Sequence, residues 1–187
     1  MASRRLILMR HAKSSWKFDV ADKERPLNSR GRKSAAGVAE ELARLGRIPS
    51  LVLSSDARRT RETLELMNLK GSESKFLPSF YGIFGKPATS VIMEQVWKHA
   101  ARGHEGTMEE PNTVMVLGHN AGWELALNDL VGPLAVPLVM KTADCFVLEP
   151  SKGSLDSGWE DIFTSFGKWR VEHHIRSRSL LPDSASS

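Results

Sequence analysis

The sequence has little of what marks a secreted, membrane-spanning or disulfide-stabilised protein. It contains one cysteine, so no disulfide can form within the chain, and a reducing compartment is expected. The longest weakly polar stretch, residues 130–140, is too short to span a bilayer and contains a glycine and two prolines. Four apolar residues near the start, 6–9, are too few for a secretory signal. We therefore expect no membrane partner and a cytoplasmic location, with an organelle as the alternative if a transit peptide has been removed.

Signatures of metal and nucleic-acid binding are also missing. His99 and His104 are not at zinc-ligand spacing with other candidates, so neither a metal site nor a cofactor is expected. There is no zinc-finger spacing, no aromatic-rich RNA-binding motif and no long basic run, which argues against nucleic acid. The single cysteine, Cys145, lies in the apolar run A-D-C-F-V-L without an activating neighbour. It is expected to be a buried strand residue rather than a nucleophile.

Positive charge is in modest excess, and it is concentrated near the start of the chain. The 187 residues carry a formal net charge of +4, and residues 1–33 hold ten Lys/Arg against three Asp/Glu. Such a local field favours an anionic ligand, although a solvated surface explains the charge equally well. The length fits one domain, expected over residues 1–175, with a serine-rich, disordered tail over 176–187 and a monomeric state as the default.

The hydrophobic pattern alternates between strands and helices. Helices are expected from Asn28 or Ser29 to Gly46, over 57–68, from a cap at Thr89 to Gly103, and over 121–131 after a cap at Asn120. Strands are expected at 6–9, 51–53, 75–77, 113–117, 143–148 and, as an edge strand, 169–175. This order predicts an α/β fold, a three-layer α/β/α sandwich with a mostly parallel sheet.

Polar and cationic residues follow three of these strands. In a parallel sheet the ligand site lies beyond the carboxyl ends of the strands, so these residues should meet there. A lone histidine or an arginine at a helix start is more often structural, but two histidines and at least two arginines at one edge make a cationic pocket. Guanidinium groups bind phosphate oxygens bidentately, which suits that pocket to phosphate. The residues are Arg10 and His11; Ser54, Ser55, Arg58, Arg59 and Arg61; and Gly118, His119 and Asn120.

Four motifs in this order resemble the histidine phosphatase superfamily, the phosphoglycerate mutase-like fold. They are R-H-A at 10–12, R-P-L-N at 25–28, S-S-D-A-R-R-T-R-E-T at 54–63 and G-H-N at 118–120. The stretch R-H-A-K-S-S-W followed by D-x-x-R-P-L-N is most similar to the short SixA-type phosphohistidine phosphatases. The resemblance covers about residues 6–175.

The resemblance implies a role for each matching residue. His11 would be the nucleophile, and Arg10 would bind the transferring phosphoryl group. Arg59 would be the second arginine, four residues before Thr63, with Arg58 as the adjacent alternative. A protonated His119 would donate to a phosphoryl oxygen. Four further residues complete the phosphate-binding set: Arg25, Ser14, Lys13 and Asn120. For Ser14 and Lys13 an ordinary solvated loop is the competing interpretation.

A general acid is the conspicuous gap. Many branches of the family place a carboxylate between the second arginine motif and the second histidine, but residues 76–84, F-L-P-S-F-Y-G-I-F, contain none. A phosphohistidine substrate, which leaves as imidazole, tolerates that gap better than a phosphate ester. The expected activity is therefore removal of phosphate from phosphohistidine in a protein, through a covalent intermediate on His11. The alternatives are a phosphomonoesterase acting on small phosphate compounds and a phospho-ligand binding module without turnover. Other acid candidates are Glu94, Glu105, Glu109 and Glu110.

Overall fold

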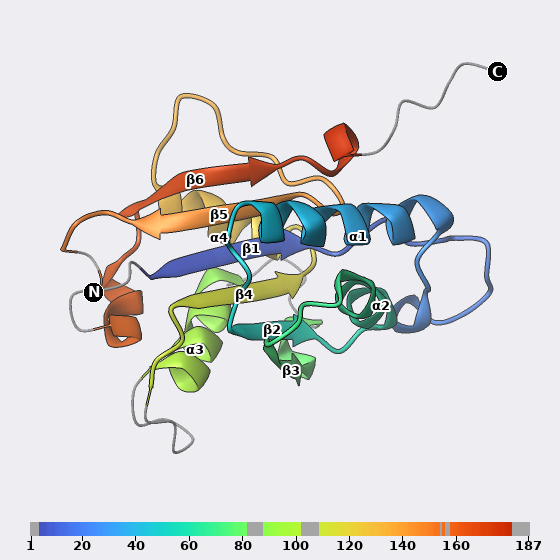
Figure 1. The fold of residues 1–187 in the computed structure, drawn as a ribbon, viewed down its shortest axis with the longest axis horizontal. Coiled ribbons are helices and arrows are strands. Elements are labelled where there is room, and N and C mark those ends of the chain that lie inside the picture. The colour runs from blue at the N-terminus through green and yellow to red at the C-terminus, as the bar shows by residue number, and fades with distance from the viewer. Residues whose placement is uncertain (1–3, 82–87, 102–108, 154, 156–157, 181–187) are drawn as a thin grey trace.

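The fold is built around a six-stranded mixed sheet (Figure 1). A computed structural model describes residues 4–81, 88–101, 109–153, 155 and 158–180 of the chain. The sheet has the strand order β3-β2-β4-β1-β5-β6. The strands are β1 (Arg5–Arg10), β2 (Leu51–Ser55), β3 (Glu73–Leu77), β4 (Thr113–Gly118), β5 (Cys145–Pro150) and β6 (Trp169–Ile175). The helices are α1 (Ser29–Arg44), α2 (Arg58–Met67), α3 (Ala88–Ala100) and α4 (Gly122–Val131).

Each face of the sheet is covered by a pair of helices. Side chains along a strand alternate between faces, and in β1 Leu6 and Leu8 pack with α3 and α4, whereas Ile7 and Met9 pack with α1 and α2. All four side chains are fully buried. The predicted three-layer α/β sandwich is therefore confirmed. None of the described helices is both long enough and apolar enough to cross a membrane.

The parallel strands have their carboxyl ends at one edge of the sheet. β1, β2, β3 and β4 run parallel, whereas β5 is antiparallel to β1 and β6 is antiparallel to β5. The carboxyl ends of β1, β2 and β4 are adjacent, and β6 ends at the same edge two strands away from β1. The prediction that the last strand lies at the edge of the sheet is confirmed.

The start of α1 is fixed against the loop that follows β1. Asn28 caps the helix, and its side chain accepts a hydrogen bond of 2.8 Å from the backbone N–H of Gly31. Gly31 is packed against the backbone of Lys13, where an added Cβ would lie 2.2 Å from the carbonyl oxygen. Only glycine permits this approach, so the helix and the loop after β1 are in direct contact.

Two predicted helix caps are wrong. Thr89 lies inside α3, and its hydroxyl donates to a carboxylate oxygen of Asp129 instead of capping the helix. The cap position of α4 is occupied by Ala121, without a side-chain hydrogen bond. Asn120 instead donates from Nδ2 to the carbonyl of Met140 at 2.9 Å. Both side chains thus donate to a distant segment, and Asn120 also donates from Nδ2 to the carboxylate of Glu124 at 3.2 Å.

The end of the chain also differs from the expectation of a disordered tail beginning at residue 176. Ser177–Leu180 form a short 3-10 helix that packs on α1. Ser177 is 3 % exposed, and its hydroxyl donates to the carbonyl of Thr142 at 3.0 Å. These contacts order the first part of the expected tail, and residues 181–187 lie outside the described residues.

Candidate active site

The two histidines lie next to each other at the carboxyl edge of the sheet. His11 directly follows β1 and His119 directly follows β4, and these strands are neighbours. The backbone N–H of His11 donates to the carbonyl of Gly118 at 2.9 Å, which continues the pairing beyond the strand ends. The ring centroids are 5.1 Å apart, with the rings tilted by 55°. The predicted convergence of these two residues is what the structure shows.

His11 is held as a neutral imidazole with one nitrogen directed into the site. The side chain is 8 % exposed, and its Nδ1 lies 2.7 Å from the carbonyl oxygen of Ala12. A carbonyl only accepts, so Nδ1 carries the proton and Nε2 has the lone pair. The pKa of His11 is held well below its usual value by burial and by His119 and Arg59, although the Ala12 carbonyl opposes the shift. Nε2 is therefore unprotonated at neutral pH, as a nucleophile must be.

Of the two arginines at the start of α2, Arg59 is the one in the site. Arg59 is 5 % exposed, and its Nε donates to Nε2 of His11 at 3.3 Å. Its Nη1 donates to the backbone carbonyl of Asp22 at 2.6 Å, and its Nη2 contacts the Asp22 carboxylate at 3.0 Å. Arg58 is exposed and pairs with Glu62, one helical turn away, at 2.8 Å. The alternative assignment of the second arginine to Arg58 therefore has no geometric support.

Arg10 and His119 leave buried polar atoms without partners. Arg10 donates from Nη1 to the carbonyl of Met140 at 3.1 Å, but its Nε has no hydrogen-bond partner among the described residues. His119 Nε2 lies 2.9 Å from the hydroxyl of Ser55, whereas its Nδ1 also has no partner there. Such orphans are rare in folded proteins, and in a cationic site they are typical of groups that bind a ligand.

The protonation state of His119 differs from the expectation. Burial, together with Arg59 and Arg10, lowers the pKa of His119 to about 3, even though Asp22 and Asp56 oppose the shift. The ring is therefore neutral in the empty site at neutral pH, rather than protonated. A phosphate dianion would partly offset the two arginines, so His119 gains a proton only with such a ligand bound.

The residues expected to complete a phosphate-binding set mostly bind each other. Arg25 is 7 % exposed and donates to the hydroxyl of Ser14 and, at 3.2 Å, to the carbonyl of Ser15. Its guanidinium also stacks on the Trp16 ring, 3.2 Å from the centroid. The side chain of Lys13 is exposed. Arg25 and Ser14 thus brace the loop that follows β1.

Asn120 has a positioning contact instead. It donates to the Met140 carbonyl at 2.9 Å, the same oxygen that receives Nη1 of Arg10 at 3.1 Å. Its Oδ1 is buried and has no partner among the described residues. Asn120 and Arg10 are therefore fixed by one carbonyl of the segment that precedes β5.

Sequence reasoning missed Asp22, which bridges the site. One carboxylate oxygen accepts from Arg25 at 2.7 Å, and the other accepts from Arg59 at 3.0 Å and from the hydroxyl of Tyr81 at 3.2 Å. Burial alone would raise the pKa of Asp22, but the hydrogen bonds from Arg25 and the charge of Arg59 bring it below its usual value. Its signal in the sequence is the aspartate of D-x-x-R-P-L-N, three residues before Arg25. The family pattern instead pointed to a carboxylate between the second arginine motif and the second histidine.

None of the acid candidates that lie within the described residues contacts this site. Glu94 is exposed on α3, and Glu105 lies outside the described residues. Glu109 lines a different pocket with Ser50 and Asn112, at the other end of the strands. Glu110 pairs with Arg4, just before β1. Across the described part of the chain, no three His, Cys, Asp or Glu side chains gather in a way that could hold a metal ion.

Comparisons with known proteins agree with this geometry. A family model for the histidine phosphatase superfamily (branch 1) matches residues 6–81. An uncharacterized chloroplastic protein of Arabidopsis thaliana is 36 % identical over 189 residues, covering 96 % of this chain and 80 % of that protein.

Solved structures share the fold. A structure described as a SixA phosphohistidine phosphatase of Agrobacterium tumefaciens has a TM-score of 0.70 at 23 % identity, over 93 % of this chain and 98 % of the other. A mycobacterial glucosyl-3-phosphoglycerate phosphatase has a TM-score of 0.59 at 19 % identity, over 91 % and 97 %. The chain is thus a histidine-type phosphatase by family, a member of the histidine phosphatase superfamily.

Proposed function

We propose that this protein removes the phosphoryl group from phosphohistidine in a protein, through a covalent intermediate on His11. The Nε2 lone pair attacks phosphorus in line. The P–N bond of the substrate breaks, and its ring, protonated on the other nitrogen, leaves with the bonding pair as a neutral imidazole. Water then attacks the phosphoryl group on His11, releasing inorganic phosphate and restoring the neutral ring. The 2.7 Å contact from Nδ1 to the Ala12 carbonyl supports this role, because it keeps the proton off Nε2.

The arginines would supply most of the transition-state stabilisation. Phosphoryl transfer depends mainly on positioning and on charge directed at the equatorial oxygens. Arg10 has an unpartnered Nε, and Arg59 directs its Nε at the nitrogen that would carry the phosphoryl group. His119 would donate to a phosphoryl oxygen once the dianion has raised its pKa.

The choice of leaving group rests on one observation, the state of Asp22. Asp22 is the carboxylate that contacts Arg59, beside the nucleophile, and Arg25 and Arg59 keep it ionised. An ionised carboxylate has no proton to give to a departing alkoxide, whereas an imidazole leaving group depends less on such a donor. The site is therefore better suited to phosphohistidine than to an alkyl phosphate.

The alternative of a small-molecule phosphomonoesterase is kept because one observation favours it. Asp22 stands beside the site, and its side chain is 42 % exposed. If a bound phosphoryl group took Arg59 away from it, the pKa of Asp22 would rise toward its usual range and the carboxyl could donate a proton. The mycobacterial phosphatase described above has the same fold, and its name gives glucosyl-3-phosphoglycerate, a small phosphate compound, as its substrate.

Leaving-group dependence separates the two activities. We would measure kcat/KM of the wild type and of Asp22→Asn on a phosphohistidine-bearing phosphotransfer protein, p-nitrophenyl phosphate and a panel of sugar phosphates. The proposal expects the phosphoprotein to be the best substrate, and Asp22→Asn to change all rates by a similar factor. A loss confined to the sugar phosphates, with faster turnover of them by the wild type, would make Asp22 a general acid and the enzyme a phosphomonoesterase.

The covalent step has its own test. A rapid alkaline quench of enzyme turning over 32P-labelled phosphoprotein should trap label on the wild type. His11→Gln should trap none, whereas His173→Gln, on the edge strand β6, should trap as much as the wild type. Label on the His11 variant would rule out His11 as the nucleophile. Binding of phosphate without turnover of any compound would favour a binding module instead.

We propose an organelle as the working location, the second of the two locations expected from the sequence. The support is the relative from Arabidopsis thaliana, whose name describes it as chloroplastic. Fractionation of the source cells with an antibody to this protein tests the location, and a signal restricted to the cytosolic fraction would contradict it.

A further inference from the structure

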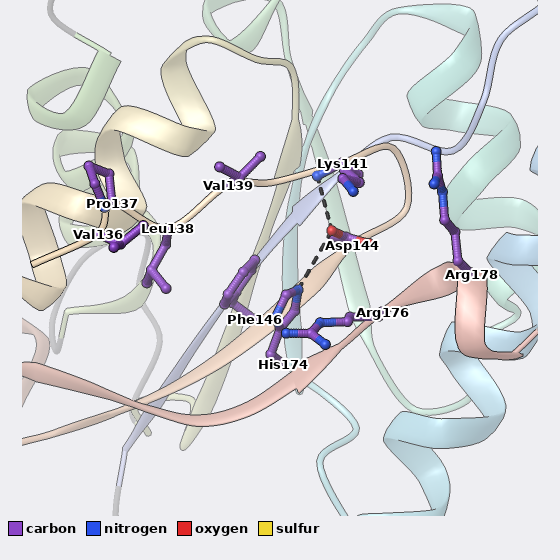
Figure 2. A pocket seen from close by; sticks show the side chains of 10 residues that line it. All are labelled: Val136, Pro137, Leu138, Val139, Lys141, Asp144, Phe146, His174, Arg176 and Arg178. Carbon is purple, nitrogen blue, oxygen red and sulfur yellow. Dashed lines mark hydrogen bonds and ion pairs between the residues drawn. The ribbon is translucent and has the colours of Figure 1, made fainter. Parts of the chain in front are cut away.

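A second pocket lies beside β5 and β6 (Figure 2), and neither His11 nor His119 lines it. Its volume is about 530 Å³, within the range of small-molecule sites. Residues 136–139 run along one side, and the rings of Phe146 and His174 lie at its centre. Phe146 belongs to the core cluster on the α3 and α4 face, which places the pocket on that face.

Three cations surround the pocket. Lys141, Arg176 and Arg178 are exposed and line it. Within the described ranges of the chain, no carboxylate forms an ion pair with any of their side chains. Elsewhere on the surface, arginines are commonly paired, as Arg170 is with Glu149 at 3.0 Å. Three unpaired cations around one concavity create a field that attracts an anion.

The one carboxylate of the lining is already committed. Asp144 Oδ2 accepts from the backbone N–H of Lys141 at 3.0 Å and lies 3.6 Å from Nε2 of His174. Its Oδ1 accepts from the backbone N–H of Ser177 at 3.4 Å. Figure 2 shows the Lys141 and His174 contacts as dashed lines. Asp144 therefore ties the walls of the pocket together. Its single negative charge offsets one of the three cations, so the lining keeps a surplus of positive charge.

The rest of the lining is apolar and aromatic. The rings of Phe146 and His174 are stacked, with centroids 3.9 Å apart and planes 17° from parallel. Val136 and Val139, on the opposite wall, are 76 % and 58 % exposed. An inorganic ion would leave these apolar groups in water, and a neutral apolar molecule would leave the cations without partners. Only a ligand with both characters satisfies the whole lining.

The pocket is close to the active site but opens beside it. Met9 of β1, Cys145 of β5 and Ile175 of β6 lie in one row across the sheet, so the end of β6 is roughly 10 Å from that of β1. The two sites share the segment before β5. The Met140 carbonyl holds Arg10, whereas the next residue, Lys141, lines the second pocket.

We propose that this pocket is a second ligand site, which binds an organic anion with an aromatic or branched apolar body. The anionic group lies among Lys141, Arg176 and Arg178. The apolar body packs between Val139 and the ring of His174, which is itself stacked on the buried ring of Phe146. This proposal does not depend on the substrate or the catalytic mechanism of the phosphatase.

The test uses 1-anilinonaphthalene-8-sulfonate, a fluorescent anion with an aromatic body, titrated into the full-length protein. Saturating tungstate, a tetrahedral oxyanion, is present to fill the phosphoryl site. We expect one dye molecule per chain, bound equally well with and without tungstate. Loss of charge-assisted contacts in Arg176→Gln/Arg178→Gln should weaken binding about tenfold. Val139→Asp, which puts a carboxylate on the apolar wall, should also weaken it.

Arg170→Gln is the control for loss of positive charge at the surface, since it removes one charge from an exposed arginine that lies outside the pocket. It should leave dye affinity within about twofold of the wild type. Tungstate affinity, measured by calorimetry, verifies that each variant is folded. The proposal is overturned if tungstate displaces the dye, if Arg170→Gln weakens binding as much as the double variant, or if the wild type binds no dye. Unchanged binding in Arg176→Gln/Arg178→Gln would overturn it as well.

Discussion

The buried, neutral His119 should make the stability of the protein fall steeply in mild acid. The side chain is 5 % exposed, and its pKa in the folded state is about 3. An unfolded histidine titrates near pH 6.5, so below that pH the unfolded chain binds a proton that the folded chain does not. Stability is therefore complete above pH 6.5 and is lost progressively as the pH falls from 6.5 toward 3.

The size of this loss follows from the distance between the two pKa values. Between pH 7 and pH 5 the proton taken up by the unfolded histidine costs about 2 kcal/mol of unfolding free energy. Domains of this kind are stable by only about 5–15 kcal/mol, so one residue accounts for a measurable share. The pKa of His11 is lowered too, so His11 also reduces the free energy of unfolding as the pH falls.

Urea unfolding of the wild type and His119→Gln at pH 7 and pH 5 isolates the contribution of His119. Glutamine does not titrate, so the variant should lose about 2 kcal/mol less than the wild type over this interval. The histidines outside the site are common to both proteins and cancel. His11 is also retained in both, and burial, the main cause of its lowered pKa, is present with or without His119. His173→Gln, a histidine on β6 outside the site, should behave as the wild type. Equal losses in the wild type and His119→Gln would refute a neutral, desolvated His119.

Further outcomes follow from the packing of the site. Arg59→Gln should lower kcat/KM on phosphoprotein at least about 100-fold. Arg58→Gln, on the exposed side of α2, should change it less than about twofold. Similar losses in both variants would contradict the assignment of Arg59 as the second arginine of the site. Gly118→Ala would place a Cβ 2.3 Å from the Trp123 ring, so urea unfolding should show a destabilisation of about 1–3 kcal/mol or more. Burial raises the pKa of the Cys145 thiol, so Ellman's reagent should react with it only after unfolding.

The strand ends could be predicted from the sequence because their signal is local. The apolar run 6–9 stops at Arg10 and His11, and the apolar run of β4 stops just before His119. Parallel pairing of the strands then brings the two histidines to one edge, where the backbone of His11 bonds to that of Gly118. Of the two arginines at the start of α2, Arg59 is the buried one, which agrees with its position four residues before Thr63. The hydroxyl of Thr63 donates to the Arg59 carbonyl at 2.6 Å.

The loop contacts could not be predicted because they depend on partners far away in the sequence. Asn120 has the composition of a helix cap, but its side chain binds Met140, 20 residues later. Arg25 has the charge of a phosphate ligand, but it is held by Ser14, Asp22 and the Trp16 ring. Helix-capping rules describe bonds between residues close in the sequence. They do not show that a carbonyl or carboxylate from another segment orients the same side chain.

The sequence shows an excess of cations near the start of the chain, but it does not show which cations are paired with carboxylates. Carboxylates already pair with Arg59 and Arg25, through Asp22, and with Lys23, through Asp56. The Arg10 guanidinium is instead held by the carbonyl of Met140, which does not cancel its charge. A phosphoryl group must therefore compete with Asp22 for Arg59 but not for Arg10. Among the described residues no carboxylate is hydrogen-bonded to Arg10, although the charges of Glu124 and Asp144 oppose the lowering of its pKa by burial. Asp22 determines how much of Arg59 the ligand can use.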